Sequence, residues 1–176
     1  MIAGVAGTAA MTAFQLAVKV LRGERLDTPV PHRWADAPPP AQVAKRAADA
    51  AGQGRRVSRE DVPLLTNVVH WLYGIGWGVA YAGAADRLRP SAPAGGALLG
   101  GTVWATSYGE LVPLGIQDPP WQYPLAELSL DLSYHLVYGA GVAGAVRLLQ
   151  ARSTTARRRR PIVGRFSQVA AAWNGG

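Results

Sequence analysis

The sequence predicts an all-α membrane protein with four transmembrane helices, arranged as a duplicated helical hairpin. Two observations lead to this fold class. The charges fall in blocks, and the stretches 1–18, 62–85, 90–109 and 132–146 contain no Asp, Glu, Lys or Arg. A motif in the second apolar stretch also recurs in the fourth. The mean hydropathy of +0.06 hides this pattern because an average does not record where the charges lie.

Each uncharged stretch, with its flanks, has the length that a bilayer requires. A helix rises about 1.5 Å per residue and the hydrocarbon core is about 30 Å thick, so a span needs about 20 mostly apolar residues. A cleaved signal peptide is the alternative for the first stretch, but no positive charge precedes it and no A-x-A site follows it before Lys19. The expected spans cover about 2–21, 63–85, 94–114 and 125–149.

The remaining residues form a loop and a tail. Residues 23–62 are expected to be an extramembrane loop with a proline-rich part and a short surface helix at 41–51. Residues 151–176 are expected to be a basic, disordered tail. The tail contains the run Arg157, Arg158, Arg159 and Arg160, which suits contact with anionic lipid headgroups. Lipid contact explains the net charge of +7 better than nucleic-acid binding does, because the chain has no nucleic-acid-binding motif.

The short connections between spans indicate an orientation. The connection 113–124 contains no Lys or Arg, whereas 86–93 contains two arginines. Because short cytoplasmic loops are enriched in Lys and Arg, both termini are expected in the cytoplasm. Membrane lipids are the expected partners, and association into a homo-oligomer is left open.

An internal repeat is the most specific signal in the chain. The pattern H-x-x-Y-G-x-G occupies 70–76 and again 135–141, and Gly7-Thr8 corresponds more weakly to Gly101-Thr102. The repeated unit is therefore a helical hairpin. Two spans return the chain to the same side, so the copies should be related by an axis along the membrane normal. The four spans are therefore expected to form a four-helix bundle with quasi-two-fold symmetry.

Polar residues within spans are the candidate functional groups, because an ionisable side chain costs about 2.5 to 3.5 kcal/mol at the centre of a bilayer. Glu127, Asp131 and His135 are four residues apart and share one helix stripe. The acids of the third and fourth spans should lie near the 113–124 connection, and the histidines should lie deeper. This arrangement predicts a polar funnel. The expected cluster comprises Asn67, His70, Tyr73, Glu110, Glu127, Asp131, His135 and Tyr138.

Four interpretations of this cluster compete. Its members can bond to one another and lock the helices together, as interhelical polar bonds do. They can instead form a proton- or ion-conducting relay. The third interpretation is a divalent metal site, although the E-x-x-H signature of di-iron bundles is absent. The fourth is axial haem ligation by His70 and His135. No nucleophile elbow, P-loop or dinucleotide fingerprint is present, so neither enzymatic activity nor a bound cofactor is expected.

Several segments together resemble a known family. The opening AGTAAMTAF at 6–14, the proline-rich first loop, HWLYG at 70–74 and YHLVYG at 134–139 resemble the YagU-like uncharacterised bacterial inner-membrane proteins. The resemblance covers residues 1–150 and implies a multi-pass protein of the bacterial plasma membrane, with no catalytic residues to transfer. The favoured expectation is a non-enzymatic structural or stress-related membrane component. The alternatives are a small proton- or ion-coupled transporter or channel, and a haem or metal protein.

Overall fold

The described part of the chain is helical throughout. The computed structural model describes residues 1–88 and 90–159, and side chains through residue 152. Short 3-10 turns precede and follow some helices, and no strand occurs among the described residues, which confirms the all-helical class. The α-helices are α1 (Ile2–Arg22), α2 (Pro39–Ala50), α3 (Val62–Leu88), α4 (Ala92–Leu111) and α5 (Leu125–Arg159).

Local sequence accounts for several helix ends. Gly23 closes α1 in the left-handed conformation, with φ of 66°, which glycine adopts without steric cost. Ser91 caps α4, and its hydroxyl accepts a hydrogen bond of 3.3 Å from the amide of Ala94. Before α3, the amide of Ser58 donates to the Asp61 carboxylate at 2.8 Å. These caps place the helix ends within a few residues of the expected span boundaries.

Helix α5 is longer than expected. It continues past the boundary near 149 to Arg159, so residues 151–159 are helical rather than disordered. Arg, Gln and Ala favour helix, which agrees with this extension. Residues 160–176, including Arg160, lie outside the described residues, and so do the side chains of Arg157, Arg158 and Arg159.

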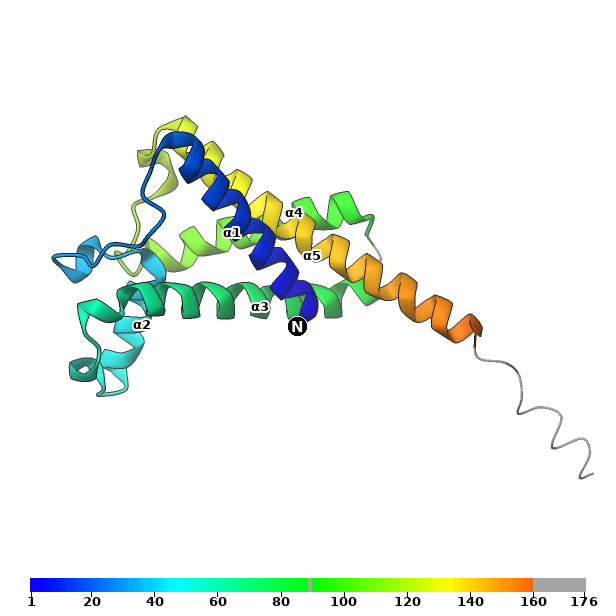
Figure 1. Cartoon of the computed structure of the whole chain (residues 1–176), viewed down its shortest axis with the longest axis horizontal. Coiled ribbons are helices and arrows are strands. Elements are labelled where there is room, and N and C mark those ends of the chain that lie inside the picture. The colour runs from blue at the N-terminus through cyan, green and yellow to red at the C-terminus, as the bar shows by residue number, and fades with distance from the viewer. Residues whose placement is uncertain (89, 160–176) are drawn as a thin grey trace, which may run out of the picture. The chain divides into compact units, whose positions relative to one another are not determined.

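Residues Met1–Val146 form one compact unit, and the described residues from Arg147 onward belong to a second. Within the first unit, glycines bring helix backbones into close contact (Figure 1). A Cβ at Gly4 of α1 would lie 2.7 Å from the Cα of Ile75 in α3, and one at Gly96 of α4 would lie 3.1 Å from the Cα of Ala140 in α5. Small residues therefore set the separation of both helix pairs.

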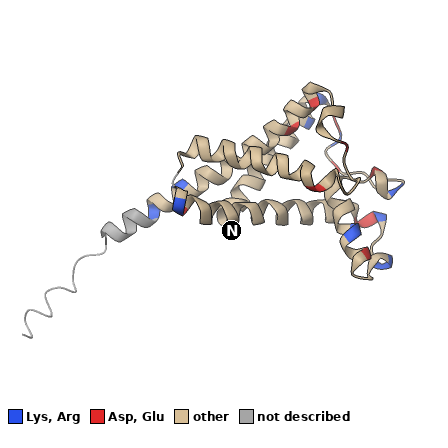
Figure 2. Ribbon diagram, turned by 180° about the vertical axis from the view of Figure 1, so that it is seen from behind, with Lys and Arg blue, Asp and Glu red and all other residues tan. Residues whose placement is uncertain are grey.

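The buried core of this unit is narrow, and its surface is rich in large apolar side chains. Tyr138 and Val142 lie at the centre of the core, with exposed fractions of 2% and 0%. By contrast, Leu72 of α3 and Leu98 of α4 are 65% and 67% exposed. Lys, Arg, Asp and Glu lie towards the two ends of the unit, and long uncharged helical stretches separate them (Figure 2).

Helix α2 is docked rather than lying free at the surface. Ala41 is fully buried against Val62 at the start of α3, in a small cluster that also contains Ala37. The side-chain Nε2 of Gln42 donates to the backbone carbonyl of Ala37 at 2.8 Å. The segment 23–62 is thus anchored to α3 by its own hydrophobic contacts.

By length and composition, α1 passes the test for a membrane span, and among the described residues no other helix does. Only 22% of the most apolar 18-residue stretch of α1 is buried, whereas the core helix of a soluble protein is mostly buried. A signal sequence near an N-terminus passes the same test. The four-span arrangement therefore stays a prediction.

Candidate functional site: a polar cavity in the helical unit

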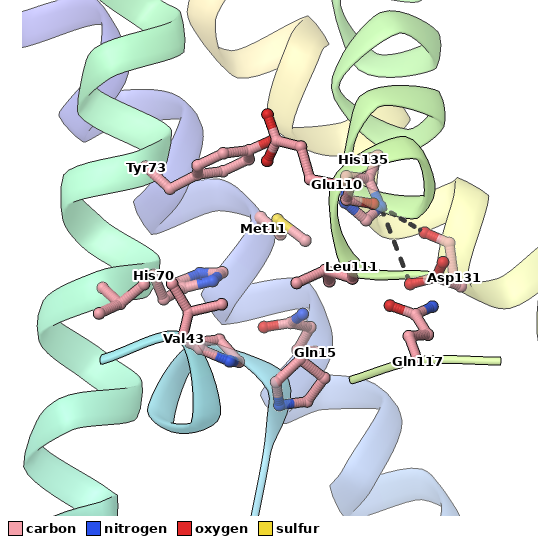
Figure 3. A pocket seen from close by; sticks show the side chains of 14 residues that line it. Met11, Gln15, Val43, His70, Tyr73, Glu110, Leu111, Gln117, Asp131 and His135 are labelled. Carbon is pink, nitrogen blue, oxygen red and sulfur yellow. Dashed lines mark hydrogen bonds and ion pairs between the residues drawn. The ribbon is translucent and has the colours of Figure 1, made fainter. Parts of the chain in front are cut away.

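A cavity of about 330 Å³ lies where α1, α3, α4 and α5 meet the start of α2 (Figure 3). Five of the eight polar residues predicted from the sequence line it. Its wall is otherwise apolar or carries neutral polar groups. The five are His70, Tyr73, Glu110, Asp131 and His135, and the other polar lining residues are Gln15, Ser107 and Gln117.

Asp131 is held in place by side chains of the neighbouring helix. The indole nitrogen of Trp104 donates to its Oδ2 at 2.9 Å, and the hydroxyl of Tyr108 donates to the same oxygen at 3.3 Å. On its own helix, Nδ1 of His135 lies 3.8 Å from Oδ1 and 2.9 Å from the backbone carbonyl of Asp131. These bonds fix the carboxylate at the cavity wall and join α4 to α5.

Glu110 and Tyr73 join α4 to α3 on the opposite side of the cavity. The Tyr73 hydroxyl donates to Oε2 of Glu110 at 3.3 Å, across 37 positions of sequence. Figure 3 shows the carboxylate beside the phenol ring. Two of the three carboxylates that the funnel prediction grouped, Glu110 and Asp131, thus line one cavity, and Glu127 does not.

His70 is the least satisfied group in the cavity. Its Nε2 is buried and has no hydrogen-bond partner among the described residues. The ring points away from α3, towards the side of the cavity where Met11 and Gln15 lie (Figure 3). His135 lines the same cavity, and no hydrogen bond between the two histidines is found. The centre is therefore a cavity and not a packed, mutually bonded histidine pair.

Three predicted residues lie away from the cavity. Tyr138 is buried one turn deeper in α5, and its hydroxyl donates to the carbonyl of Gly74 at 2.6 Å. Glu127 is exposed on α5. Asn67 is exposed and donates to the carbonyl of Pro63 in its own helix at 2.9 Å, although it lines a second, neighbouring cavity.

The sequence reasoning did not assign Trp104 to the site. Trp104 and Tyr108 are four residues apart on α4, so two hydrogen-bond donors share one helix face and reach the same carboxylate. That spacing was the available signal. An aromatic residue near the end of an apolar stretch is equally typical of the membrane interface, and this is why the pattern alone does not decide the role.

The described residues contain no group of three or more His, Cys, Asp or Glu side chains that could hold a metal ion. His70 and His135 are the two histidines of the cavity, and the only acidic oxygen within 4.0 Å of either ring belongs, among the described side chains, to Asp131. The arrangement therefore gives no support to the metal interpretation.

Comparisons with known proteins found no match to a family model, to a curated protein or to a solved structure. The resemblance to YagU-like proteins stays a prediction. The function must be argued from the geometry of the cavity and from the surface of the helices.

Proposed function

We propose that the chain is a multi-pass protein of the bacterial plasma membrane, with α1, α3, α4 and the apolar part of α5 as its four spans and both termini in the cytoplasm. The exposed apolar side chains support this proposal. Leu64 and Leu72 of α3 and Leu98 of α4 are each more than 60% exposed. Exposing many large apolar side chains is unfavourable in water, whereas lipid tails cover them without cost.

The proposed duplication is supported by matching contacts. Gly4 packs on Gly74 and Ile75, while Gly96 packs on Gly139 and Ala140. Gly74 and Gly139 hold the same place in the two copies of the H-x-x-Y-G motif. These contacts pair Gly4 of the first copy with Gly96 of the second. The weaker sequence alignment of Gly7 with Gly101 would instead pair Gly4 with position 98, so the two alignments differ by two residues.

For activity, we propose a small proton- or ion-coupled transporter or channel that uses the polar cavity. One observation carries this proposal. His70, Tyr73, Glu110, Asp131 and His135, from three helices, face a cavity of about 330 Å³. Ionisable groups gathered within a helical membrane domain commonly mark substrate or ion pathways. The role is non-enzymatic, and no cofactor is part of the proposal.

A purely structural role is the second candidate, and the bonds of Asp131 favour it. Trp104 and Tyr108 tie Asp131 to α4, and Tyr138 ties α5 to Gly74 of α3. Interhelical hydrogen bonds of this kind contribute on average about 0.6 kcal/mol each in membranes. In this role the cavity would carry no ion.

Flux measurements separate the two candidates. Protein reconstituted into liposomes that contain a pH-sensitive dye is expected to move protons or cations down an imposed gradient. Glu110→Gln and Asp131→Asn should reduce that flux about tenfold or more, equivalent to about 1.4 kcal/mol. Glu127→Gln is the matched control because this carboxylate is exposed and lies outside the cavity. No flux from wild type, or equal flux from all variants, would favour the structural role.

The absence of cysteine makes the topology easy to test. Single substitutions Ser91→Cys and Gln117→Cys place thiols in the α3–α4 and α4–α5 connections. A membrane-impermeant maleimide should label position 117 from the outside of intact cells and position 91 only after permeabilisation. Labelling of both from one side, or recovery of the protein in the soluble fraction, would contradict the four-span proposal.

A further inference from the structure

The charges at the cavity wall have one sign. Glu110 and Asp131 contribute carboxylates, and no Lys or Arg occurs among the described residues that line the cavity. The hydrogen bonds that these carboxylates accept come from neutral donors, namely Tyr73 for Glu110 and Trp104 and Tyr108 for Asp131. Nδ1 of His135 lies 3.8 Å from Oδ1 of Asp131 and forms an ion pair with it only when the imidazole is protonated. Among the described residues, neither carboxylate is neutralised by an Arg or Lys partner. A bound cation would provide that neutralisation, whereas an anion would be repelled.

The size and the walls of the cavity indicate an organic ligand. About 330 Å³ falls at the lower end of the range for small-molecule sites, which is about 300 to 1,000 Å³. Met11, Val43, Val69 and Leu111 provide apolar surface. A bare metal cation prefers a shell of several ligands, and the described residues contain no group of three or more His, Cys, Asp or Glu side chains that could hold one. The walls instead suit a compact hydrocarbon part.

The hydrogen-bonding groups narrow the ligand further. The Nε2 atom of His70 has no partner among the described residues, but it is buried and out of reach of a water-sized group, so it offers no acceptor to a ligand in the cavity. Each carboxylate has acceptor capacity beyond the bonds found. The two carboxylates would therefore satisfy a ligand that carries several N–H donors. A quaternary ammonium ion carries none.

We infer that the polar cavity binds a small primary ammonium ion with a compact apolar part, recognised by the carboxylates of Glu110 and Asp131. The inference rests on the proposed transport function, for which it names the class of ion. The charge provides attraction, the N–H groups provide specificity and the apolar walls accommodate the hydrocarbon part.

Binding to purified full-length protein in detergent tests this inference without a transport assay. The probes are n-butylammonium, tetramethylammonium, n-butanol and butyrate, measured by isothermal titration and by the shift in Tm. Butylammonium is expected to bind at least tenfold more tightly than the other three. Glu110→Gln should weaken its binding about tenfold and reduce the preference for butylammonium over butanol. Glu127→Gln should leave both unchanged.

The outcomes are distinguishable from those of the flux experiment. Equal binding of butylammonium and butanol would overturn the inference, and so would equal loss in Glu127→Gln and Glu110→Gln. Proton flux without ammonium binding would retain the transport proposal and reject the ligand class. Ammonium binding without any flux would retain the ligand class and reject transport. Asp131→Asn provides a second variant in case Glu110→Gln does not fold.

Discussion

The indole nitrogen of Trp104 donates a hydrogen bond of 2.9 Å to the Oδ2 atom of Asp131. The two residues lie 27 positions apart and belong to α4 and α5. Trp104, whose role the sequence pattern leaves undecided, therefore serves as a partner of a partly buried carboxylate.

Replacing Trp104 with Phe should lower the stability of the helical unit. The change removes the indole donor and leaves Asp131 with the weaker bond from Tyr108 at 3.3 Å. An interhelical hydrogen bond in a membrane contributes about 0.6 kcal/mol on average, so a small fall in Tm in detergent is expected. Trp121→Phe is the control because Trp121 is 80% exposed, and an equal fall there would contradict the assignment.

Gly100 and Gly101 are neighbours in sequence, and alanine should affect them in opposite ways. A Cβ at Gly100 would lie 2.5 Å from the carbonyl oxygen of His135, whereas one at Gly101 would meet nothing within 4 Å. Gly100→Ala should destabilise by about 1 to 3 kcal/mol because α4 and α5 must separate. Gly101→Ala should be neutral or stabilise by up to about 1 kcal/mol. Unfolding in denaturing detergent compares the two directly.

Tyr73 and Tyr138 occupy the same place in the repeated motif, but loss of their hydroxyls should have different effects. Tyr138 is buried and donates to the carbonyl of Gly74, so Tyr138→Phe should cost about 0.5 to 1.5 kcal/mol. Tyr73 is only partly buried and its partner Glu110 is exposed, so Tyr73→Phe should change stability little and alter ligand binding instead. A larger fall in Tm for Tyr73→Phe would be inconsistent with this assignment.

The docking of α2 can be probed by proteolysis. Ala41 is fully buried against α3, whereas Ala47 of the same helix is exposed. Ala41→Glu places a charge in an apolar contact and should release α2, because an unpaired buried charge is strongly unfavourable. Trypsin should then cleave after Lys45 and Arg46 much faster than in wild type. Ala47→Glu should cleave at the wild-type rate, and similar acceleration in both variants would argue against the docked helix.

Much of the helical pattern follows from the sequence. Prolines at 63 and 124 mark helix starts, and the uncharged stretches mark helix bodies. The end of α5 was less predictable because Arg and Gln favour helix. Their appearance after an apolar stretch marks the end of the apolar part but not the end of the helix. The docking of α2 depends on contact between Ala41 and Val62, which are distant in sequence and carry no local signal.

The sequence by itself determined which residue types recur, namely His and Tyr in the two motif copies, and which acids lie near them. The tertiary structure decided which of them share a cavity. Helical spacing puts Glu127, Asp131 and His135 on one stripe, but only the last two lie beside α3 and α4, so Glu127 is left exposed. Likewise, Gly7 and Gly74 leave room for the ring of Tyr138 to be buried. The matching Tyr73 is only partly buried, and its hydroxyl donates to Glu110. Periodicity fixes the face of a helix, but the neighbouring helices determine what that face meets.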